Sequence, residues 1–419
     1  MKSNASIRHL VLIWLGWSVV ILAFQHWIGA RLELQPPDRA LNWTAAETIP
    51  HSQDDKPTLL DPFMNEHVAW DSEFYLSIAI SGYNDPNVRG IPANFSWGSF
   101  TGRFCEPQAN SECAALNYAF FPLYSWLTWL FALPLRLLPL TVIARATLAA
   151  VIVSLLGALG AMVSLYFMSR ESLGEEGGVR AAFYLLIFPS GFFLAQVYTE
   201  GLFLGLTFGA LAFLLARKWG WSALLAALAV WARPGGAILL LPMAVVWLMD
   251  RSWLAGPRSA VMRGVAALSP AISYGVWSLS PLAEKFHRVE SLYFSRKLLA
   301  VESSLYAWKQ GWGALWENNS QAAFYYTLEF AAVALAMTAC LLLFRERPEV
   351  SAFGLAMIFF SMTSGVPQGM IRYVLAAPAM FWVLARWGRN PVFDKIWTLA
   401  SILLLGMEVM LFSFNFWVA

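Results

Sequence analysis

A succession of long apolar stretches, separated by short charged loops, constrains this chain more than any other feature of its sequence. About 20 consecutive apolar residues suffice for a helix to cross a membrane. Hydrophobic residues make up 58% of the chain and charged residues only 13%, which lies far outside the range of soluble globular proteins. We therefore expect an all-α polytopic membrane protein in which residues 1–419 form a single integral membrane domain.

The first apolar run, residues 10–28, follows Lys2 and Arg8 and lacks the small-residue cleavage site of a signal peptide. We expect it to be the first transmembrane helix, with the N-terminus in the cytoplasm. Residues 29–117 hold twelve acidic and only five basic residues, which indicates a loop on the outside. This outside region is expected to extend to residue 140 and to contain short juxtamembrane helices.

The segment 118–138 is apolar but interrupted by Pro122 and Pro134, and whether it spans decides the side of every later loop. If it does not span, arginines and lysines concentrate in the cytoplasmic loops, as the positive-inside rule requires. We therefore predict eleven transmembrane helices in all. The ten later ones occupy two blocks, 141–280 and 322–419, on either side of a second outside loop at 281–321, and are expected at 141–168, 180–196, 199–216, 219–232, 235–249, 260–280, 322–344, 349–366, 372–387 and 395–417.

Several common functions have no support in the sequence. The net charge of +2 and the absence of a basic tail argue against a nucleic-acid partner. The histidines and cysteines lack the spacing of metal ligands, so we expect no metal. Cys105 and Cys113 lie eight residues apart in the first outside loop and are a candidate disulfide, which forms only if that loop faces an oxidising compartment.

Under this topology, polar residues at the outer ends of the helices converge on one side. They are Asp71, Glu73, Arg136, Arg145, Tyr198, Thr199, Glu200, Arg233, Arg288, Arg296, Lys297, Gln368, Arg372 and Tyr373. Ionisable groups at the rim of an apolar bundle are costly and indicate function. A carboxylate can take a proton from a hydroxyl nucleophile while arginines neutralise a departing phosphate, so Asp71 is the candidate catalytic base.

Each of these residues also has a purely structural interpretation. Asp71 could be the N-cap of a helix over 72–81, and Glu200 a first-turn acid favoured by a helix dipole. Arg233 precedes a Pro-Gly-Gly turn and could extend to the membrane surface. Arg136, Arg145 and Arg372 could each anchor the interface. The sequence alone leaves these alternatives open.

Five sequence blocks carry a family resemblance. They are WDSEFYLSIAISGY (70–83), NYAFFPLYSWL (117–127), FPSGFFLAQVYTEGLF (188–203), WARPGG (231–236) and IRYVLAAPAMFW (371–382). In kind and order they resemble the family of the mannosyltransferase that adds the second mannose in glycosylphosphatidylinositol-anchor assembly, together with its prokaryotic relatives. This family belongs to the GT-C membrane glycosyltransferases.

The resemblance implies a GT-C-like bundle with an essential aspartate in the first outside loop, the position of Asp71. It implies that Trp70, Tyr75 and Tyr83 shape the sugar or lipid site. It also matches Glu200 to an acid that follows a Ser-Pro-type helix end in relatives, and Arg372 with Tyr373 to a late Arg-Tyr pair. Ala69 occupies a place where relatives carry a basic residue, so the donor phosphate is expected to bind one of the remaining arginines, Arg136, Arg145, Arg233 or Arg372.

The sequence and the resemblance together predict an inverting enzyme that needs no cofactor. Its donor is expected to be a polyprenyl- or dolichyl-phosphate mannose, and its acceptor a lipid- or glycan-linked hydroxyl on the outer or lumenal face. The membrane is expected to be the cell membrane in a prokaryote and the endoplasmic reticulum in a eukaryote. Two alternatives stay open: a lipid or solute transporter, and a noncatalytic scaffold for another glycosyltransferase.

Overall fold

The computed structural model describes residues 2–34, 36–49, 51–52, 56–96, 104–107, 112–254 and 256–419. In this part of the chain the structure is a bundle of helices, and its strands are the two-residue β1 (Gly90–Ile91) and β2 (Ala114–Ala115), which pair antiparallel. The all-α fold class is therefore confirmed.

The helices follow the order of the apolar stretches. Those of the first half are α1 (Lys2–Arg31), α2 (Thr44–Glu47), η1 (Pro57–Leu59), η2 (Asn65–His67), α3 (Ser72–Ser81), η3 (Leu116–Ala119), α4 (Pro122–Ala132), η4 (Pro134–Leu137), α5 (Val142–Ile187), η5 (Pro189–Ala195) and α6 (Glu200–Leu215). Those of the second half are α7 (Trp219–Ala232), η6 (Pro234–Leu239), α8 (Leu240–Met249), η7 (Ser252–Leu254), α9 (Pro257–Ser278), α10 (Pro281–Leu292), α11 (Val301–Ala314), α12 (Ser320–Leu343), α13 (Pro348–Met362), α14 (Met370–Tyr373), η8 (Val374–Ala376), α15 (Pro378–Trp387) and α16 (Pro391–Ser413).

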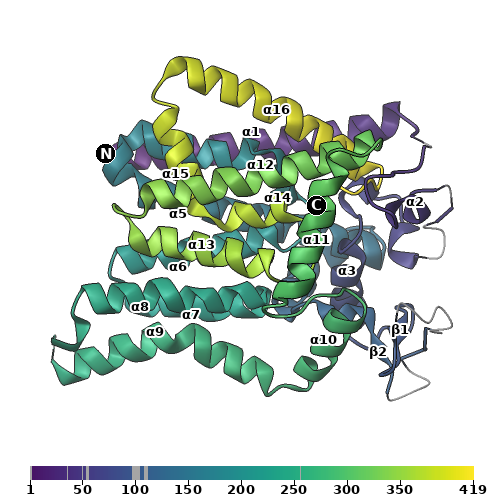
Figure 1. Ribbon diagram of the computed structural model, residues 1–419, viewed down its shortest axis with the longest axis horizontal. Helices are drawn as coiled ribbons and strands as arrows, with labels where there is room; N and C mark the ends of the chain where they lie inside the picture. Colours follow the sequence, from purple (N-terminus) through teal and green to yellow (C-terminus); the bar gives the residue numbers. More distant parts are fainter. Residues whose placement is uncertain are drawn as a thin grey trace.

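The two long loops lie at one end of the bundle, which we call the loop end. Figure 1 shows α2, α3, β1, β2 and α10 gathered there, with the N-terminus at the opposite end. The loops also touch each other, because the Asn319 side chain donates to the Arg39 carbonyl at 2.6 Å and the Arg39 N–H donates to Gln321 at 2.7 Å. A second tie runs from Arg288 to the Glu112 carbonyl at 2.8 Å. The structure thus brings both predicted outside loops to the same end.

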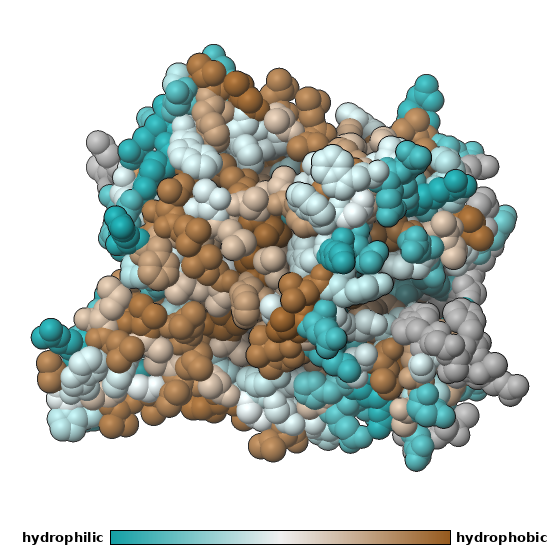
Figure 2. All heavy atoms as spheres, in the orientation of Figure 1, coloured by the Kyte–Doolittle hydropathy of each residue, from teal (hydrophilic) through white to brown (hydrophobic). Residues whose placement is uncertain are grey.

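An apolar surface covers the middle of the bundle. Figure 2 shows it across the helices, with hydrophilic residues gathered over the loop end. Exposed hydrophobic side chains contribute to this surface from several helices, among them Val19, Leu268, Ile272 and Leu399. Such a continuous apolar surface would be unstable in water and is the expected surface of a protein embedded in lipid. The chain is therefore an integral membrane protein.

The number of membrane-crossing helices stays a prediction. Within the described residues, α1, α5, α12 and α16 are each long and apolar enough to cross alone, and η5 with α6 forms a fifth candidate bent by 97°. The spans expected at 141–168 and 180–196 appear as the single element α5, interrupted at Gly174, whose φ is +77°. In the segment 118–138, α4 has only eleven residues, too few to cross a hydrocarbon core about 30 Å thick.

The backbones of α5 and α6 approach each other closely, and glycine makes this possible. A Cβ added to Gly201 would overlap the carbonyl of Ser154, and Gly205 and Gly157 are in similar contact with the facing backbone. Small residues spaced four apart allow membrane helices to approach in this way. This packing fixes the start of α6, where Glu200 lies.

We expect the substitution Gly201→Ala to separate α5 from α6 and to lower the free energy of unfolding by about 1–3 kcal/mol, because the new methyl meets backbone that cannot move aside. Thermal unfolding of the purified protein in detergent measures the effect. The control is Gly275→Ala in α9, where an added Cβ has nothing within 4 Å. Equal stability of the two variants would contradict this account of the packing.

Candidate active site

Asp71 immediately precedes α3, but its side chain does not cap that helix. Its carboxylate turns instead toward α14, where Arg372 Nη1 donates to Asp71 Oδ2 at 3.1 Å. The residue before it, Trp70, has a φ of +54°, which is rare for a bulky side chain and costs of the order of 1–3 kcal/mol. The backbone is therefore held in a strained turn that directs the carboxylate away from the helix it could have capped.

Four charged side chains form a continuous sequence of ion pairs, which we call the charge chain: Asp71, Arg372, Glu200 and Arg233. Arg372 Nε lies 3.3 Å from Glu200 Oε1, and Arg233 Nη2 contacts the same oxygen. Two acids and two guanidinium groups alternate, so their formal charges cancel. Buried ions of this kind are tolerated only when each has an opposite charge beside it.

The charge chain is open at one end. The Glu200 side chain is fully buried and the Arg372 side chain is 5% exposed, whereas that of Asp71 is 24% exposed. Arg372 occupies Oδ2 of Asp71, and the structure records no partner for Oδ1 among the described residues. A molecule that enters from the loop end therefore meets a carboxylate with one oxygen available to accept a hydrogen bond.

Three tyrosines support the charge chain. The Tyr198 hydroxyl accepts the Asp71 N–H at 3.3 Å and donates to the Ala69 carbonyl at 3.0 Å, so it bridges the strained turn. Tyr75 contacts Thr199 through the two hydroxyls at 3.4 Å. Tyr373 accepts from Arg372 Nη2 at 3.2 Å. Tyr198 was recognisable only as a polar residue at a helix end, since its role depends on a turn that is distant in sequence.

A buried glutamate outside the charge chain fixes the turn that carries Arg372. Glu329 of α12 accepts the Gly369 N–H at 2.8 Å and the Ile371 N–H at 2.6 Å, one with each carboxylate oxygen. Gly369 has a φ of +87°, a conformation that glycine adopts without strain. Periodicity places Glu329 inside an apolar helix, and no sequence signal relates it to residues 369–371.

We expect Glu329→Gln to lower the free energy of unfolding by about 1–3 kcal/mol, because the amide can accept only one of the two N–H groups and turns a donor toward the other. Thermal unfolding in detergent measures this loss. Glu408→Gln is the matched control, since Glu408 is also a buried glutamate but has no recorded hydrogen bond in the described structure. A larger loss in Glu408→Gln than in Glu329→Gln would contradict the assigned role.

Two aromatic residues expected at the site, Trp70 and Tyr83, are not part of the charge chain. Trp70 packs edge-on against Trp43 and Trp417, with ring centroids 5.6 and 4.9 Å away. Tyr83 donates to the Phe120 carbonyl at 2.6 Å, outside the charge chain.

The remaining two expected arginines, Arg136 and Arg145, do not reach the charge chain. Arg136 is exposed in η4 and Arg145 is half-buried at the start of α5. The described structure records no contact from either guanidinium to Asp71. Both follow α4 in the chain, Arg136 in η4 and Arg145 in α5.

Two further charged residues act on the site from the second loop. Arg296, in the loop between α10 and α11, lies over the Tyr373 ring at 5.4 Å. Glu290 of α10 is half-buried, and burial raises the pKa of its carboxyl to about 7; the negative charge of Asp71 acts in the same direction and Arg296 in the opposite one. Arg296 was already one of the rim cations in the sequence, but Glu290 had no distinguishing pattern.

The raised pKa of Glu290 predicts a pH-dependent stability. Its carboxyl titrates near 4.5 when unfolded and near 7 when folded, so the folded state loses stability relative to the unfolded state as the pH rises through that window. Glu290→Gln removes this dependence. We therefore expect the stability of the variant relative to the wild type to increase as the pH is raised from 5 to 8, as measured by thermal unfolding. Parallel pH profiles of the two proteins would contradict the prediction.

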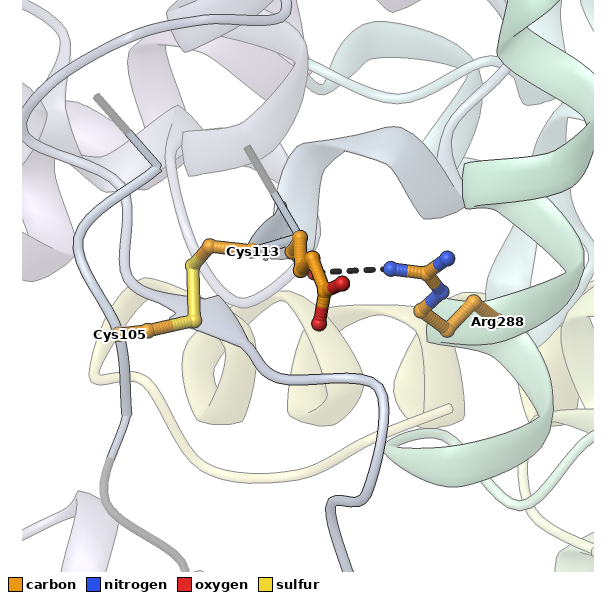
Figure 3. Close-up of a disulfide and its surroundings, with 4 residues drawn as sticks. Cys105, Cys113 and Arg288 are labelled. Carbon is orange, nitrogen blue, oxygen red and sulfur yellow. Dashed lines mark hydrogen bonds between the residues drawn. A yellow bond between two sulfur atoms is a disulfide. The ribbon is translucent and has the colours of Figure 1, made fainter. Parts of the chain in front are cut away.

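The first of the two predicted outside loops contains a disulfide. Figure 3 shows Cys105 joined to Cys113, with Arg288 of α10 bonded to the neighbouring backbone. Such a bond persists in an oxidising compartment, in line with the predicted outside position of the loop. Among the residues described, no group of three or more His, Cys, Asp or Glu side chains is placed to hold a metal ion.

Comparisons with known proteins found similarity at the level of structure. The chain matches no protein-family model, and no curated protein matches it. ArnT from Cupriavidus metallidurans bound to undecaprenyl phosphate is 15% identical, with 83% of this chain and 72% of that chain covered and a TM-score of 0.45.

The oligosaccharyltransferase of Archaeoglobus fulgidus is also similar. Its apo form is 13% identical, with 96% of this chain and 56% of that chain covered and a TM-score of 0.46. Its complex with an inhibitory peptide and a dolichol-phosphate is 14% identical, with a TM-score of 0.44.

Proposed function

We propose that this protein is an inverting membrane glycosyltransferase. It moves a hexose, which the sequence resemblance identifies as mannose, from a polyprenyl- or dolichyl-phosphate donor to a lipid- or glycan-linked hydroxyl. The observation that carries the proposal is the position of Asp71, a carboxylate at the open end of a buried chain of arginines and acids. The reaction takes place on the outer or lumenal face, to which the predicted topology assigns the loop end.

The geometry supports Asp71 as the general base. Oδ1 accepts the proton of the acceptor hydroxyl, whose oxygen attacks the anomeric carbon of the donor sugar from the side opposite the phosphate. The new carbon–oxygen bond forms as the bond from the anomeric carbon to the phosphate oxygen breaks, and that electron pair leaves with the polyprenyl phosphate. One displacement inverts the anomeric configuration.

Arg372 positions this base. Its charge-assisted hydrogen bond to Oδ2 orients the carboxylate and leaves Oδ1 toward the acceptor hydroxyl. Glu200 pairs with both Arg372 and Arg233 and balances part of their positive charge. Asp71 is therefore not the only counter-charge to Arg372, and its second oxygen stays available. Tyr198 fixes the backbone of the base.

The substitution Asp71→Asn tests the base directly. It keeps the size of the side chain but removes its capacity to take a proton, and we expect the transfer rate to fall by about 10²–10⁴-fold. The measurement is transfer of label from polyprenyl-phosphate mannose to hydroxyl acceptors, or to water, by the purified protein alone. This format also separates an enzyme from a scaffold that needs another transferase.

Glu73→Gln is the control for the loss of one negative charge in the same segment. Glu73 lies two residues from Asp71 and pairs with Lys56 at 3.5 Å, outside the charge chain. We expect this variant to retain activity within a few-fold of the wild type. Transfer at the wild-type rate by Asp71→Asn would refute the assignment of the base.

A further inference from the structure

Arg296 differs from the other arginines of the site in how its charge is balanced. Its guanidinium stacks over Tyr373 and donates to the Gln368 carbonyl at 3.3 Å, and no carboxylate within ion-pair distance is recorded for it among the described residues. A carbonyl oxygen carries only a partial charge. Glu290 is the carboxyl whose charge interacts with that of Arg296, and because burial raises its pKa to about 7 it is largely protonated below that pH. Arg296 thus brings a positive charge to the site that an anionic ligand could neutralise.

The arginines that the sequence predicts for the donor phosphate are less suitable than Arg296. Arg233 and Arg372 are committed to Glu200, and Arg372 also to Asp71. To bind a phosphate, either would have to give up its ion pair with the fully buried Glu200, which would then keep only one of its two cations. Neither Arg136 nor Arg145 has a recorded contact with the charge chain in the described part of the structure.

The loop that carries Arg296 is held in a defined position. The Arg296 N–H donates to the Glu290 carbonyl at 2.8 Å, and the next residue, Lys297, donates to the Ser364 carbonyl at 2.8 Å. Ala300 N–H donates to the Thr363 carbonyl at the same distance. The loop is therefore fastened to the end of α13 on one side and to α10 on the other, and the guanidinium is positioned before any ligand arrives.

Apolar side chains begin two residues after Arg296, beyond the exposed Lys297. Leu298 is 72% exposed and Leu299 is 57% exposed, and the exposed side chains of Val301 and Leu305 continue from them along α11. A cation next to an exposed apolar strip matches an amphiphile whose charged head is joined to a hydrocarbon chain. A free phosphate would use only the first of these two features.

We propose that Arg296 binds the phosphate of the lipid-linked donor, with the polyprenyl chain lying along Leu298 and Leu299. This assignment rests on the proposed function, because it supplies that reaction with its leaving-group site. Arg296 and Arg372 both contact the Tyr373 ring, at 5.4 and 5.1 Å from its centroid, so a phosphate on Arg296 would lie near the charge chain without breaking its ion pairs. When the bond to the sugar breaks, the additional negative charge develops on a phosphate oxygen that Arg296 already contacts.

The test is a binding experiment, so its outcome does not depend on turnover. Undecaprenyl phosphate is titrated into the purified full-length protein in detergent, and the dissociation constant is measured by microscale thermophoresis. We expect Arg296→Gln to weaken binding by about tenfold or more, because a charge-assisted, bidentate contact is lost. Arg296→Lys keeps the positive charge but cannot make two parallel hydrogen bonds to the phosphate. Its affinity is expected to lie between those of the wild type and Arg296→Gln.

Matched controls separate this effect from a general loss of charge or fold. Arg288→Gln removes one positive charge from the same region, where Arg288 is already paired with Glu284 at 3.0 Å, and should bind within about twofold of the wild type. Thermal unfolding without ligand verifies that Arg296→Gln is folded. Should that variant not fold, Arg296→Lys decides the matter, since its binding must still fall below that of the wild type.

Two further ligands distinguish the possible sources of the phosphate. Undecaprenol, which lacks the phosphate, and inorganic phosphate, which lacks the chain, are each expected to bind at least about tenfold more weakly than undecaprenyl phosphate. The proposal is overturned if Arg296→Gln binds undecaprenyl phosphate as tightly as the wild type, or if Arg288→Gln loses as much affinity. It is also overturned if either partial ligand binds as tightly as the complete lipid.

The variant Asp71→Asn separates a failure of this proposal from a failure of the proposed function. It is expected to bind undecaprenyl phosphate normally while it fails to transfer sugar. If Asp71→Asn transfers sugar at the wild-type rate but Arg296→Gln loses the lipid, the base is misassigned and the phosphate site stands. If Asp71→Asn is inactive but Arg296→Gln binds the lipid normally, the phosphate site is wrong and the base stands.

Discussion

The ion pairs between Asp71, Arg372, Glu200 and Arg233 are the interaction on which the site depends. In an apolar bundle none of these charges is stable alone, and each is compensated by its neighbour. Their backbone positions come from α3, α6, α14 and the turn between α7 and η6. The requirement for charge balance therefore also fixes how these elements meet, and it leaves one carboxylate facing the open side.

Much of the fold follows from the sequence because membrane helices obey simple rules of length and hydropathy. The expected segment 219–232 is the observed α7, and the expected segment 199–216 differs from α6 by one residue at each end. The sequence predicts a loop between the spans that end at residue 168 and begin at residue 180. In the structure this stretch is part of α5, because the helix resumes directly after Gly174. Hydropathy shows where a helix is apolar but not how sharply the chain bends.

The site was less predictable, and the reason is its long-range geometry. Asp71, Glu200, Arg233 and Arg372 were all candidates by residue type and by their positions at helix ends, and the structure brings them together. Arg136 and Arg145 were candidates for the same reasons, but they follow a short helix whose direction the sequence does not determine. Glu329 and Glu290 had no visible pattern, because their roles depend on backbone groups and charges from other segments.

The separations along the chain within this set of ion pairs are very unequal, and they imply an order of assembly. Glu200 and Arg233 are 33 residues apart and belong to consecutive helical segments, so their pair can form soon after both have entered the membrane. Asp71 and Arg372 are 301 residues apart. During synthesis from the N-terminus, Asp71 is therefore made long before its cation exists. The nascent protein must carry this carboxylate without Arg372 through most of its insertion, and the set of ion pairs is complete only when its last helices are made.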